Sequence, residues 1–144
     1  MAAELTANMA QTVAAGQNVL FTEAPVGCNR GYVVHRKGSG LVTLRGLCNG
    51  CSNFARYKVL FIGNISIPTG GTVEAISLAL SLGGEAIQQT TATVTPAAAG
   101  SAFNVATAAF IDVPRNCCAS LAIKNISAQT INVANANLMV ERVA

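Results

Sequence analysis

Residues 54–67 read FARYKVLFIGNISI, and this stretch decides the fold class of the 144-residue chain. Apolar side chains occur at every second position over most of it, at Tyr57, Val59, Phe61, Ile65 and Ile67. Polar residues fall between them, at Arg56, Lys58, Asn64 and Ser66. A period of two predicts a β-strand with one face in the core. Leu60 and Ile62 interrupt the polar set, so we expect part of the second face to be covered as well.

The same alternation recurs along the rest of the second half of the chain. Residues 74–82 place apolar side chains on one face and small Ala or Ser side chains on the other. Residues 102–113 and 131–143 alternate in a similar way. Turns rich in Gly and Pro separate the stretches, as at residues 38–40 and 68–71. About eight short strands with regular turn signals predict an all-β, antiparallel sandwich or barrel.

The composition indicates that the chain associates. Hydrophobic residues make up 51% of it and charged residues only 10%, whereas a charged share of about 25% is usual. Either a membrane or neighbouring copies would explain a surface with so little charge. No run of about 18 apolar residues occurs, so no membrane span is predicted. We therefore expect the chain to bind copies of itself.

The sequence lacks the residues that catalysis requires. Asp and Glu together number 6, and the single histidine is His35. General acid–base and nucleophilic catalysis need titratable groups held in pairs or triads. The acidic residues of the second half, such as Glu74 and Asp112, fall on different expected strands with no histidine near them in sequence. We expect a non-enzymatic protein without catalytic residues or a cofactor.

Residues 1–17 are interpreted as an N-terminal arm that precedes a domain at residues 18–144. Leu5, Met9 and Val13 recur every four residues, which favours a short helix that Gly16 would end. These three apolar residues are candidates for contacts with another subunit. No secretory signal is visible, so we expect synthesis in a reducing cytosol, with retention there or release by lysis.

The basic residues are unevenly placed along the chain. No acidic residue lies between Glu23 and Glu74, and six of the 9 bases fall in or near this interval. They are Arg30, Arg36, Lys37, Arg45, Arg56 and Lys58. They either bind an anionic partner, such as a capsid surface or a glycan, or belong to solvated strand faces and turns. Nucleic acid lacks support as a partner, because the interleaved aromatic residues that stack on bases are missing.

The last expected strand, at residues 131–143, carries asparagines and almost no charge. Asn132, Asn135 and Asn137 are neutral hydrogen-bonding side chains of the kind that line a polar subunit interface. The same three side chains are equally compatible with exposure to water. The strand itself is suited to a shielded position in the middle of a sheet.

Five cysteines are present: Cys28, Cys48, Cys51, Cys117 and Cys118. Cys48 and Cys51 have the spacing of half a zinc site or of a redox pair, and they are weak metal-ligand candidates because a matching second pair is missing. Adjacent residues of a strand point to opposite faces, so Cys117 and Cys118 are poorly placed to chelate together. The thiols are either buried and reduced or joined in disulfides formed after release, within or between subunits.

Several stretches resemble the later strands of the trimeric jelly rolls of the tumour-necrosis-factor-like and complement-like families. They are YKVLFIGNI at residues 57–65, ISLALSLGGE at residues 76–85, LAIKN at residues 121–125 and the closing residues 131–138. The similarity covers about residues 54–144. The whole chain, including residues 28–32 and 40–46, resembles small proteins encoded by phages and prophages of gut Firmicutes. Its low aromatic content departs from the family, so aliphatic and Asn contacts would have to replace a ring-lined trimer axis.

The resemblance implies a jelly-roll sandwich that assembles as a homotrimer on the outside of a bacteriophage virion. The protein would be a capsid decoration or head-fibre protein, with residues 1–17 anchored in a neighbouring subunit or in the capsid lattice. Its partners would be its own copies, other virion or surface-assembly proteins, and a host-surface glycan. Two other functions stay open. One is a self-polymerising spore or cell-surface filament subunit whose arm adds a strand to the next subunit. The other is a carbohydrate- or receptor-binding module.

Overall fold

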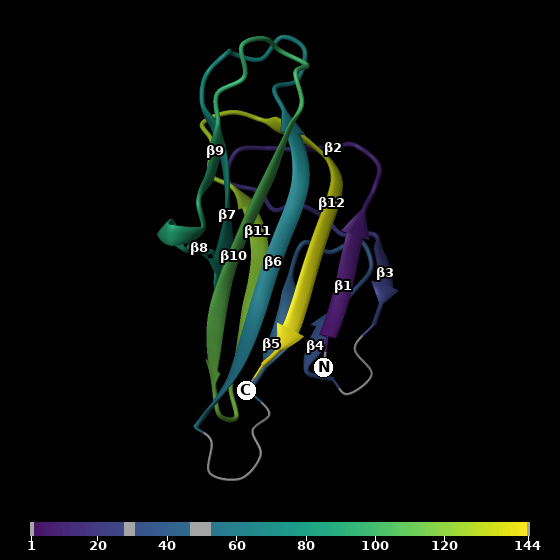
Figure 1. Ribbon diagram of the computed structural model, residues 1–144, viewed down its shortest axis with the longest axis vertical. Helices are drawn as coiled ribbons and strands as arrows, with labels where there is room; N and C mark the ends of the chain where they lie inside the picture. Colours follow the sequence, from purple (N-terminus) through teal and green to yellow (C-terminus); the bar gives the residue numbers. More distant parts are fainter. Residues whose placement is uncertain (1, 28–30, 47–52, 144) are drawn as a thin grey trace.

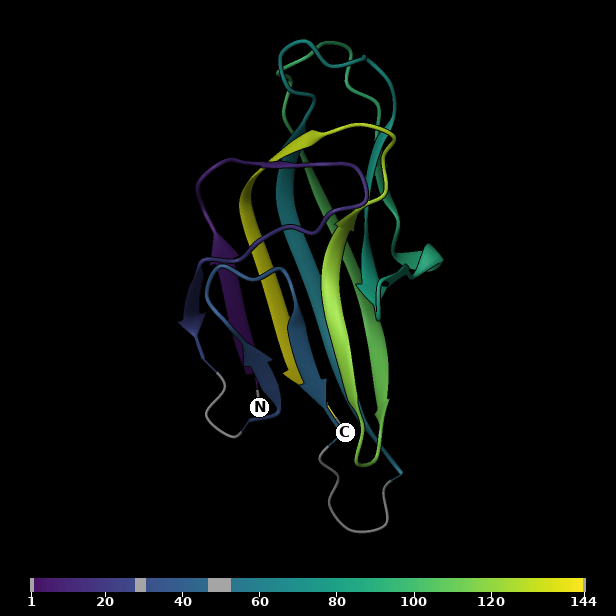
Figure 2. The ribbon, with the colours of Figure 1, turned by 180° about the vertical axis from the view of Figure 1, so that it is seen from behind.

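The computed structural model describes residues 2–27, 31–46 and 53–143, which form two antiparallel sheets packed face to face (Figure 1). Sheet A lies toward the viewer in Figure 1, and sheet B lies behind it and comes forward in Figure 2. Sheet A contains, in spatial order, β10 (Phe103–Pro114), β6 (Phe54–Ser66), β12 (Ile131–Arg142), β1 (Ala2–Ala7) and β3 (Glu23–Val26), with β2 (Gln11–Val13) also on β12.

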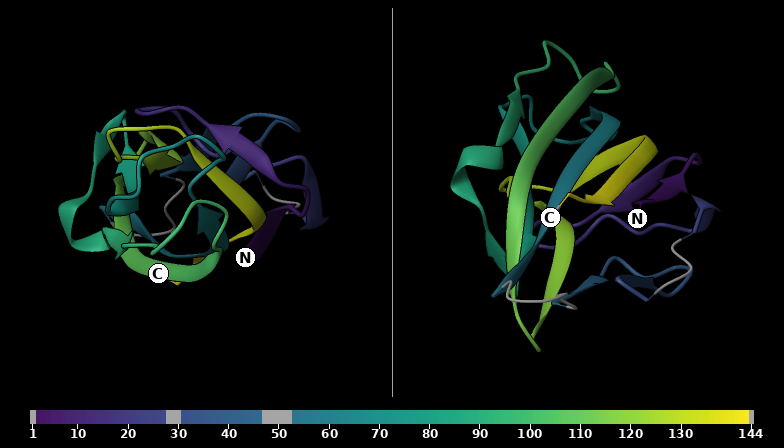
Figure 3. Two further views of the ribbon diagram at one scale, coloured as in Figure 1. Left: turned by 90° about the horizontal axis from the view of Figure 1, so that it is seen from above. Right: turned by 60° about the horizontal axis from the view of Figure 1, so that its bottom comes forward.

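Sheet B forms the second layer, which the view from above in Figure 3 separates from the first. Its strands, in spatial order, are β4 (Val33–His35), β5 (Val42–Arg45), β11 (Cys118–Asn125), β7 (Ile76–Leu82) and β8 (Glu85–Ala86), with β9 (Ala92–Val94) on β7. A 3₁₀ turn, Gln88–Thr90, lies between β8 and β9. Of the twelve strands found in the described residues, four have three residues or fewer, which accounts for the difference from the eight or so that the sequence predicts. The all-β sandwich is confirmed.

The core lies between the two sheets, and strict alternation supplies it. In β6 the odd-numbered residues from Ala55 to Ile65 are all buried, and Tyr57, Val59 and Phe61 are fully buried. Leu78 and Leu80 of β7 meet them from the other layer as part of one buried cluster. Each fully buried aliphatic or aromatic side chain stabilises the fold by about 1.5–3 kcal/mol relative to exposure. The pattern that the sequence shows at residues 54–67 therefore places β6 at the centre of the sandwich.

The N-terminal residues belong to sheet A, so the predicted short helix is wrong. Strand β1 pairs along its whole length with β12, from Ala2 opposite Glu141 to Ala7 opposite Ala136. Leu5 and Val13 are each only 2% exposed and lie in the core, whereas Met9 is 85% exposed in the turn between β1 and β2. The four-residue spacing was misleading because a turn at residues 8–10 separates two short strands, each of which obeys a period of two.

A β-bulge interrupts β12 and changes which residues point inward. Ala134 pairs with Asn64, and the next paired residue of β12 is Asn137, which faces Ile62. One residue of β6, Gly63, is therefore opposite two residues of β12, Asn135 and Ala136, and Asn135 is in the left-handed region at φ 52°. Before the bulge Ile131 and Val133 are buried, and after it Ala136, Leu138 and Val140 are buried. The bulge thus keeps apolar side chains on the core face along the entire strand.

Candidate assembly face

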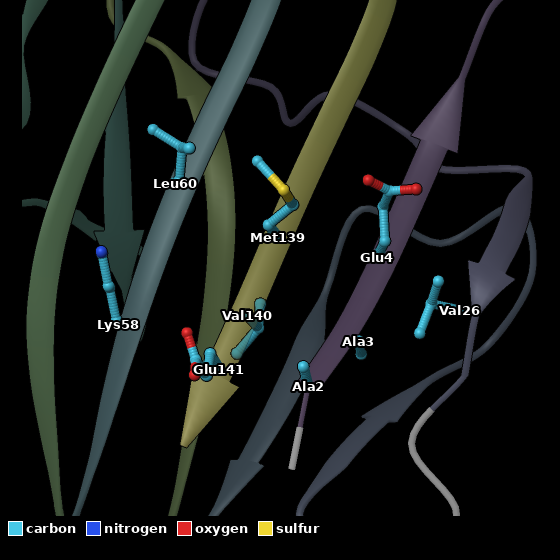
Figure 4. A pocket seen from close by; sticks show the side chains of 9 residues that line it. All are labelled: Ala2, Ala3, Glu4, Val26, Lys58, Leu60, Met139, Val140 and Glu141. Carbon is cyan, nitrogen blue, oxygen red and sulfur yellow. The ribbon is translucent and has the colours of Figure 1, made fainter. Parts of the chain in front are cut away.

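The outer face of sheet A carries rows of side chains that run across the strands. The register places Ala108, Leu60 and Met139 opposite one another on β10, β6 and β12, and the row continues to Glu4 of β1 and Val26 of β3. Figure 4 shows Leu60, Met139 and Glu4 side by side, with Val26 beyond them. Directly opposed side chains of neighbouring strands lie within contact distance. These residues therefore form one continuous surface.

The neighbouring rows extend this surface in both directions. On one side, Phe110 faces Lys58, Lys58 faces Glu141, and Glu141 faces Ala2. On the other side, Ala106 faces Ile62, and Asn137 lies next to Ile62 and opposite Thr6. We call the apolar residues of the three rows the assembly face. They are Ala2, Val26, Leu60, Ile62, Ala106, Ala108, Phe110 and Met139.

The outer face of sheet B is of a different character. Its outward residues include Ser77, Ala79 and Ser81 of β7 and Ser120 of β11, which are small or polar, and Ala79 and Ser81 are covered. Lys124 closes the row, and its Nζ donates a hydrogen bond to the Gly84 carbonyl at 3.0 Å. Large outward apolar side chains are thus more numerous on sheet A than on sheet B, where Val34 of β4 is 46% exposed. A contiguous apolar surface of this kind marks an interaction site.

A shallow depression lies within the assembly face. It has a volume of ≈ 320 Å³, and its lining comes from β1, β3, β6 and β12 (Figure 4). Its charged lining consists of the carboxylates of Glu4 and Glu141 and the ammonium group of Lys58. Its apolar lining consists of Ala2, Ala3, Val26, Leu60, Met139 and Val140. A second, more open hollow of ≈ 620 Å³ adjoins Phe110, Lys58 and Asp112. The face is therefore uneven, with a depression at one side and an exposed aromatic ring at the other.

An ion pair between β6 and β10 lies at the lower end of the assembly face. The Arg56 guanidinium donates two hydrogen bonds to the Asp112 carboxylate, from Nε at 2.7 Å and from Nη2 at 2.9 Å. These bonds lower the pKa of Asp112 below its ordinary value, and the Asp112 carboxylate raises the pKa of Arg56. The Arg56 guanidinium also lies 4.9 Å from the centre of the Phe54 ring. Because both ionic side chains are nearly half exposed, the pair chiefly orients the end of β10 and adds little stability.

Hydrogen-bonded asparagines lie at the upper end of the assembly face. Asn104 Nδ2 donates to Asn64 Oδ1 at 3.1 Å, and Asn64 Nδ2 donates to Asn135 Oδ1 at 3.3 Å. The three amides form a chain of hydrogen bonds across β10, β6 and β12. Asn137 lies lower on the same face, where its Nδ2 donates to Glu4 Oε2 at 3.5 Å. Asn132, beside Ser66, completes the set of asparagines that the sequence singled out on this strand.

The structure separates the basic residues that the sequence groups together. Arg56 and Lys58 lie on the outer face of sheet A, whereas Arg36 and Lys37 are exposed in the turn between β4 and β5. Arg45 is exposed at the end of β5 in the other sheet. Arg30 lies outside the described residues. The described candidates therefore fall into two separate pairs, Arg56 with Lys58 on sheet A and Arg36 with Lys37 in the turn, with Arg45 apart from both.

The cysteines that the structure describes are exposed. Cys117 and Cys118 are free thiols in the hairpin that joins β10 to β11, so the prediction of buried thiols is wrong for this pair. A hairpin tip has no second layer of structure to cover its side chains. Cys28, Cys48 and Cys51 fall outside the described residues. Over residues 2–27, 31–46 and 53–143, no group of three His, Cys, Asp or Glu side chains is placed to hold a metal ion.

The residues of the assembly face that the sequence analysis missed are mainly those of β10. Ala106, Ala108 and Phe110 occur at every second position between the core residues Val105 and Ile111, so a second apolar face was visible in the sequence. Leu60 and Ile62 gave the same signal on β6, where the sequence does predict a covered face. Both are half-buried.

Comparison with known proteins relates the chain by its fold. No protein-family model and no curated protein matches its sequence. The globular domain of zebrafish complement 1qA superposes with a TM-score of 0.67 at 11% identity, over 99% of this chain and 97% of that one. The Eiger TNF of S. frugiperda gives a TM-score of 0.68 at 11% identity, over 100% and 92% of the two chains. The vertex protein P5 of PRD1 gives 0.54 at 10% identity, over 99% and 96%. The chain has the jelly-roll fold of tumour-necrosis-factor-like and complement-like domains, as the sequence resemblance predicts.

Proposed function

We propose that this chain is a non-enzymatic structural protein of a bacteriophage virion, of the capsid decoration or head-fibre type, and that it assembles as a homotrimer through the assembly face. The observation that carries the proposal is the contrast between the two outer faces. Large apolar side chains point outward from sheet A in three adjoining rows, at Phe110, Leu60, Met139 and Ile62, whereas the outward residues of β7 and β11 in sheet B are small or polar. Burying one such face between copies removes apolar surface from water, which is the main driving force of association.

The edge of sheet A supports association as well. Strand β10 has twelve residues and pairs only with β6 among the described strands. Its single charged side chain, Asp112, is already engaged by Arg56. A long edge with so little charge is a surface that soluble proteins cover or protect, and self-assembly is one way to cover it.

The similarity to the PRD1 vertex protein favours a virion over a cellular location. The described residues also contain no helix long and apolar enough to cross a membrane. His35, the one histidine, lies in the β4–β5 hairpin, where its Nε2 is 2.9 Å from the Ser39 carbonyl oxygen. The His35 ring also lies edge-on to Phe21, with the ring centres 6.4 Å apart. Other virion proteins and a host-surface glycan are the proposed outer partners.

The test is the native mass of the purified chain, measured by light scattering, followed by its binding to phage capsids. We expect three times the chain mass of 14.7 kDa and co-sedimentation with capsids that lack the protein. A monomer that leaves the capsids unbound would contradict the proposal. Turnover of a small molecule by the purified chain would contradict the non-enzymatic part.

A second candidate is a filament subunit that exchanges its N-terminal segment, and the position of β1 favours it. This six-residue strand lies next to the N-terminus and fills the space between β12 and β3. A strand in that position is one that a neighbouring subunit can donate, and residues 1–17 would then act as an exchange segment or anchor. A chain truncated before residue 18 tests this, because a synthetic peptide of residues 1–17 should bind it and restore its thermal stability.

A further inference from the structure

We infer that the outer face of sheet A holds a calcium site formed by Glu4 and Thr6 of β1, Glu23 of β3 and Asn137 of β12. The inference is independent of the proposed trimer, because it concerns side chains of a single copy. Its starting point is the hydroxyl group of Thr6. This residue is only 7% exposed, and its Oγ1 has no hydrogen-bond partner among the described residues. A buried polar atom without a partner costs free energy, and a ligand bound beside Thr6 would remove that cost.

A second unpartnered oxygen belongs to the residue opposite Thr6. Asn137 pairs with Thr6 across β12 and β1, and its Oδ1 is also buried without a hydrogen-bond partner in the described part of the chain. The nitrogen of the same amide is already engaged, because Nδ2 donates to Glu4 Oε2 at 3.5 Å. Turning the amide over would place Oδ1 against the carboxylate, and both groups are acceptors. The hydroxyl and amide oxygens are therefore available to a cation.

Two carboxylates flank these oxygens. Glu23 is opposite Thr6 on β3, and Glu4 precedes Thr6 by two residues on the same face of β1. Figure 4 shows the Glu4 carboxylate directed along β1 toward the end of the strand that carries Thr6. Within the described residues neither carboxylate forms an ion pair, since the only one joins Arg56 and Asp112. The two rows of paired residues that contain Glu4 and Glu23 also carry no lysine or arginine.

The spacing of the four side chains suits a single ion. Side chains directly opposed across an antiparallel pair have Cβ atoms about 4.5–5.5 Å apart, and diagonal neighbours are about 7–8 Å apart. Calcium binds oxygen at about 2.3–2.6 Å, so two oxygens on one ion are separated by up to about 5 Å. Asn137 and Glu23 both oppose Thr6, and the longer Glu4 side chain already crosses the diagonal to Asn137. All four side chains can therefore reach one point beside Thr6.

The donor set selects the ion. It consists of oxygen atoms only, and hard cations prefer such ligands. Two carboxylates, an amide and a hydroxyl differ from the groups of three His, Cys, Asp or Glu that the described residues lack. Magnesium demands a near-ideal octahedron and keeps its waters, whereas calcium accepts irregular geometry and bidentate carboxylates. Because Glu23 is exposed and leaves the site open to water, we expect a dissociation constant of about 0.1–1 mM, as in extracellular modules.

The experiment compares three site variants of the full chain with wild type and one control. Thr6→Val keeps the size of the side chain and removes the hydroxyl, and Glu4→Gln and Glu23→Gln each remove one negative charge. Glu141→Gln is the matched control, because Glu141 lies on the same outer face but in the row of Lys58. In EDTA, Thr6→Val should melt at or above the temperature of wild type, because it removes a buried group without a partner. This variant therefore separates loss of the ligand from loss of the fold.

We expect about 10 mM calcium chloride to raise the melting temperature of wild type and of Glu141→Gln by about 3–8 °C at one fixed protein concentration. The three site variants should gain less than about a third of this shift, and titration calorimetry should show calcium binding weakened about 10-fold or more. Magnesium chloride, and sodium chloride at matched ionic strength, should have smaller effects than calcium on wild type.

Three results would overturn the calcium site. They are the absence of a calcium-dependent shift in wild type, an equal shift with sodium chloride, and a full shift retained by Thr6→Val and Glu4→Gln. A shift with magnesium as large as that with calcium would overturn the choice of ion. The proposed trimer is tested by native mass in EDTA, so its failure and that of the calcium site are distinguishable.

Discussion

The side-chain amide of Asn125 joins two parts of the chain that are 112 residues apart. Its Nδ2 donates to the Val13 carbonyl at 3.0 Å and to the Gln129 carbonyl at 3.0 Å, and its Oδ1 accepts from the Ser127 amide at 2.9 Å. Asn125 is fully buried, so these bonds tie β2 to the end of β11 inside the fold. Each bond also satisfies a backbone group that would otherwise lose its partner.

Replacement of Asn125 by alanine should therefore destabilise the fold strongly. The change leaves two carbonyl groups and one amide without their partner, and one unsatisfied buried group costs roughly 1–3 kcal/mol. Urea denaturation at one fixed protein concentration measures the loss in free energy of unfolding. Asn132→Ala is the matched control, because Asn132 is half-buried and makes no side-chain hydrogen bond among the described residues. Equal stability of the two variants would contradict the role assigned to Asn125.

Gly46 should not tolerate a side chain. A Cβ atom at this position would lie 2.0 Å from the Pro114 carbonyl oxygen and 3.0 Å from that of Cys117. Both are backbone atoms held in the β10–β11 hairpin, where the Gly46 amide donates to the Cys117 carbonyl at 2.8 Å. Gly46→Ala should lower the free energy of unfolding by about 1–3 kcal/mol or more, as overpacking does.

Gly27→Ala is the control for the Gly46 variant, because nothing lies within 4 Å of a Cβ atom added there. Thermal melts of the two variants should differ by several degrees, with Gly27→Ala close to wild type. A wild-type melting temperature for Gly46→Ala would show that the hairpin moves freely to make room.

A charge at the centre of the assembly face should dissociate the protein without unfolding it. Leu60 is half-buried on the outer side of β6, so Leu60→Glu leaves the core untouched and places a carboxylate where another copy would bury it. We expect a monomer by light scattering with an unchanged β-rich circular dichroism spectrum. Thr43→Glu, on the outer side of β5 in sheet B, should remain assembled. Loss of assembly in both variants would argue against a specific role for sheet A.

The Arg56–Asp112 pair should make a small contribution to stability that depends on pH. The guanidinium lowers the pKa of Asp112 from its ordinary value of 3.8. A depressed folded-state pKa means that the stabilisation is present above about pH 4 and is lost as the pH falls through the folded-state value. Asp112→Asn should therefore melt at a slightly lower temperature than wild type at pH 7, and the two should converge in strong acid.

Glu85→Gln is the control for Asp112→Asn, because Glu85 is exposed at the start of β8 and forms no ion pair within the described part of the chain. Its melting temperature should follow that of wild type over the whole pH range. A difference between Asp112→Asn and wild type that persists unchanged at low pH would exclude the ion pair as its cause.

The strand pattern was predictable wherever alternation is regular. In β6 and β7 the residues expected to face the core are buried, except Leu82, which is half-buried. The turn at residues 68–71 closes with a hydrogen bond from the Gly71 amide to the Pro68 carbonyl. The hairpin at residues 38–40 also joins two paired strands as expected. The N-terminal residues were not predictable in this way. Three apolar residues at a spacing of four are compatible with one helix or with two strands and a turn, and only pairing with β12 selects the strands.

The site was harder to predict than the fold, because it depends on register. Phe110 and Met139 lie on different strands that are neighbours of β6, and their position on one face follows from how those strands pair. The bulge at Asn135 shifts the inward phase of β12, and without that shift Met139 would point into the core. The exposure of Cys117 and Cys118 likewise follows from their place at a hairpin tip.

By itself the sequence determined that this chain forms antiparallel strands around an aliphatic core, because the period of two is visible within each strand. It also determined that the surface carries few charged side chains, because the charged fraction is a property of composition alone. The tertiary structure decided which strands are neighbours, which end of the chain enters the sheet, and where the apolar outer residues gather. Those features depend on contacts between residues far apart in sequence, whose pairing is set by the burial of both sheets at once.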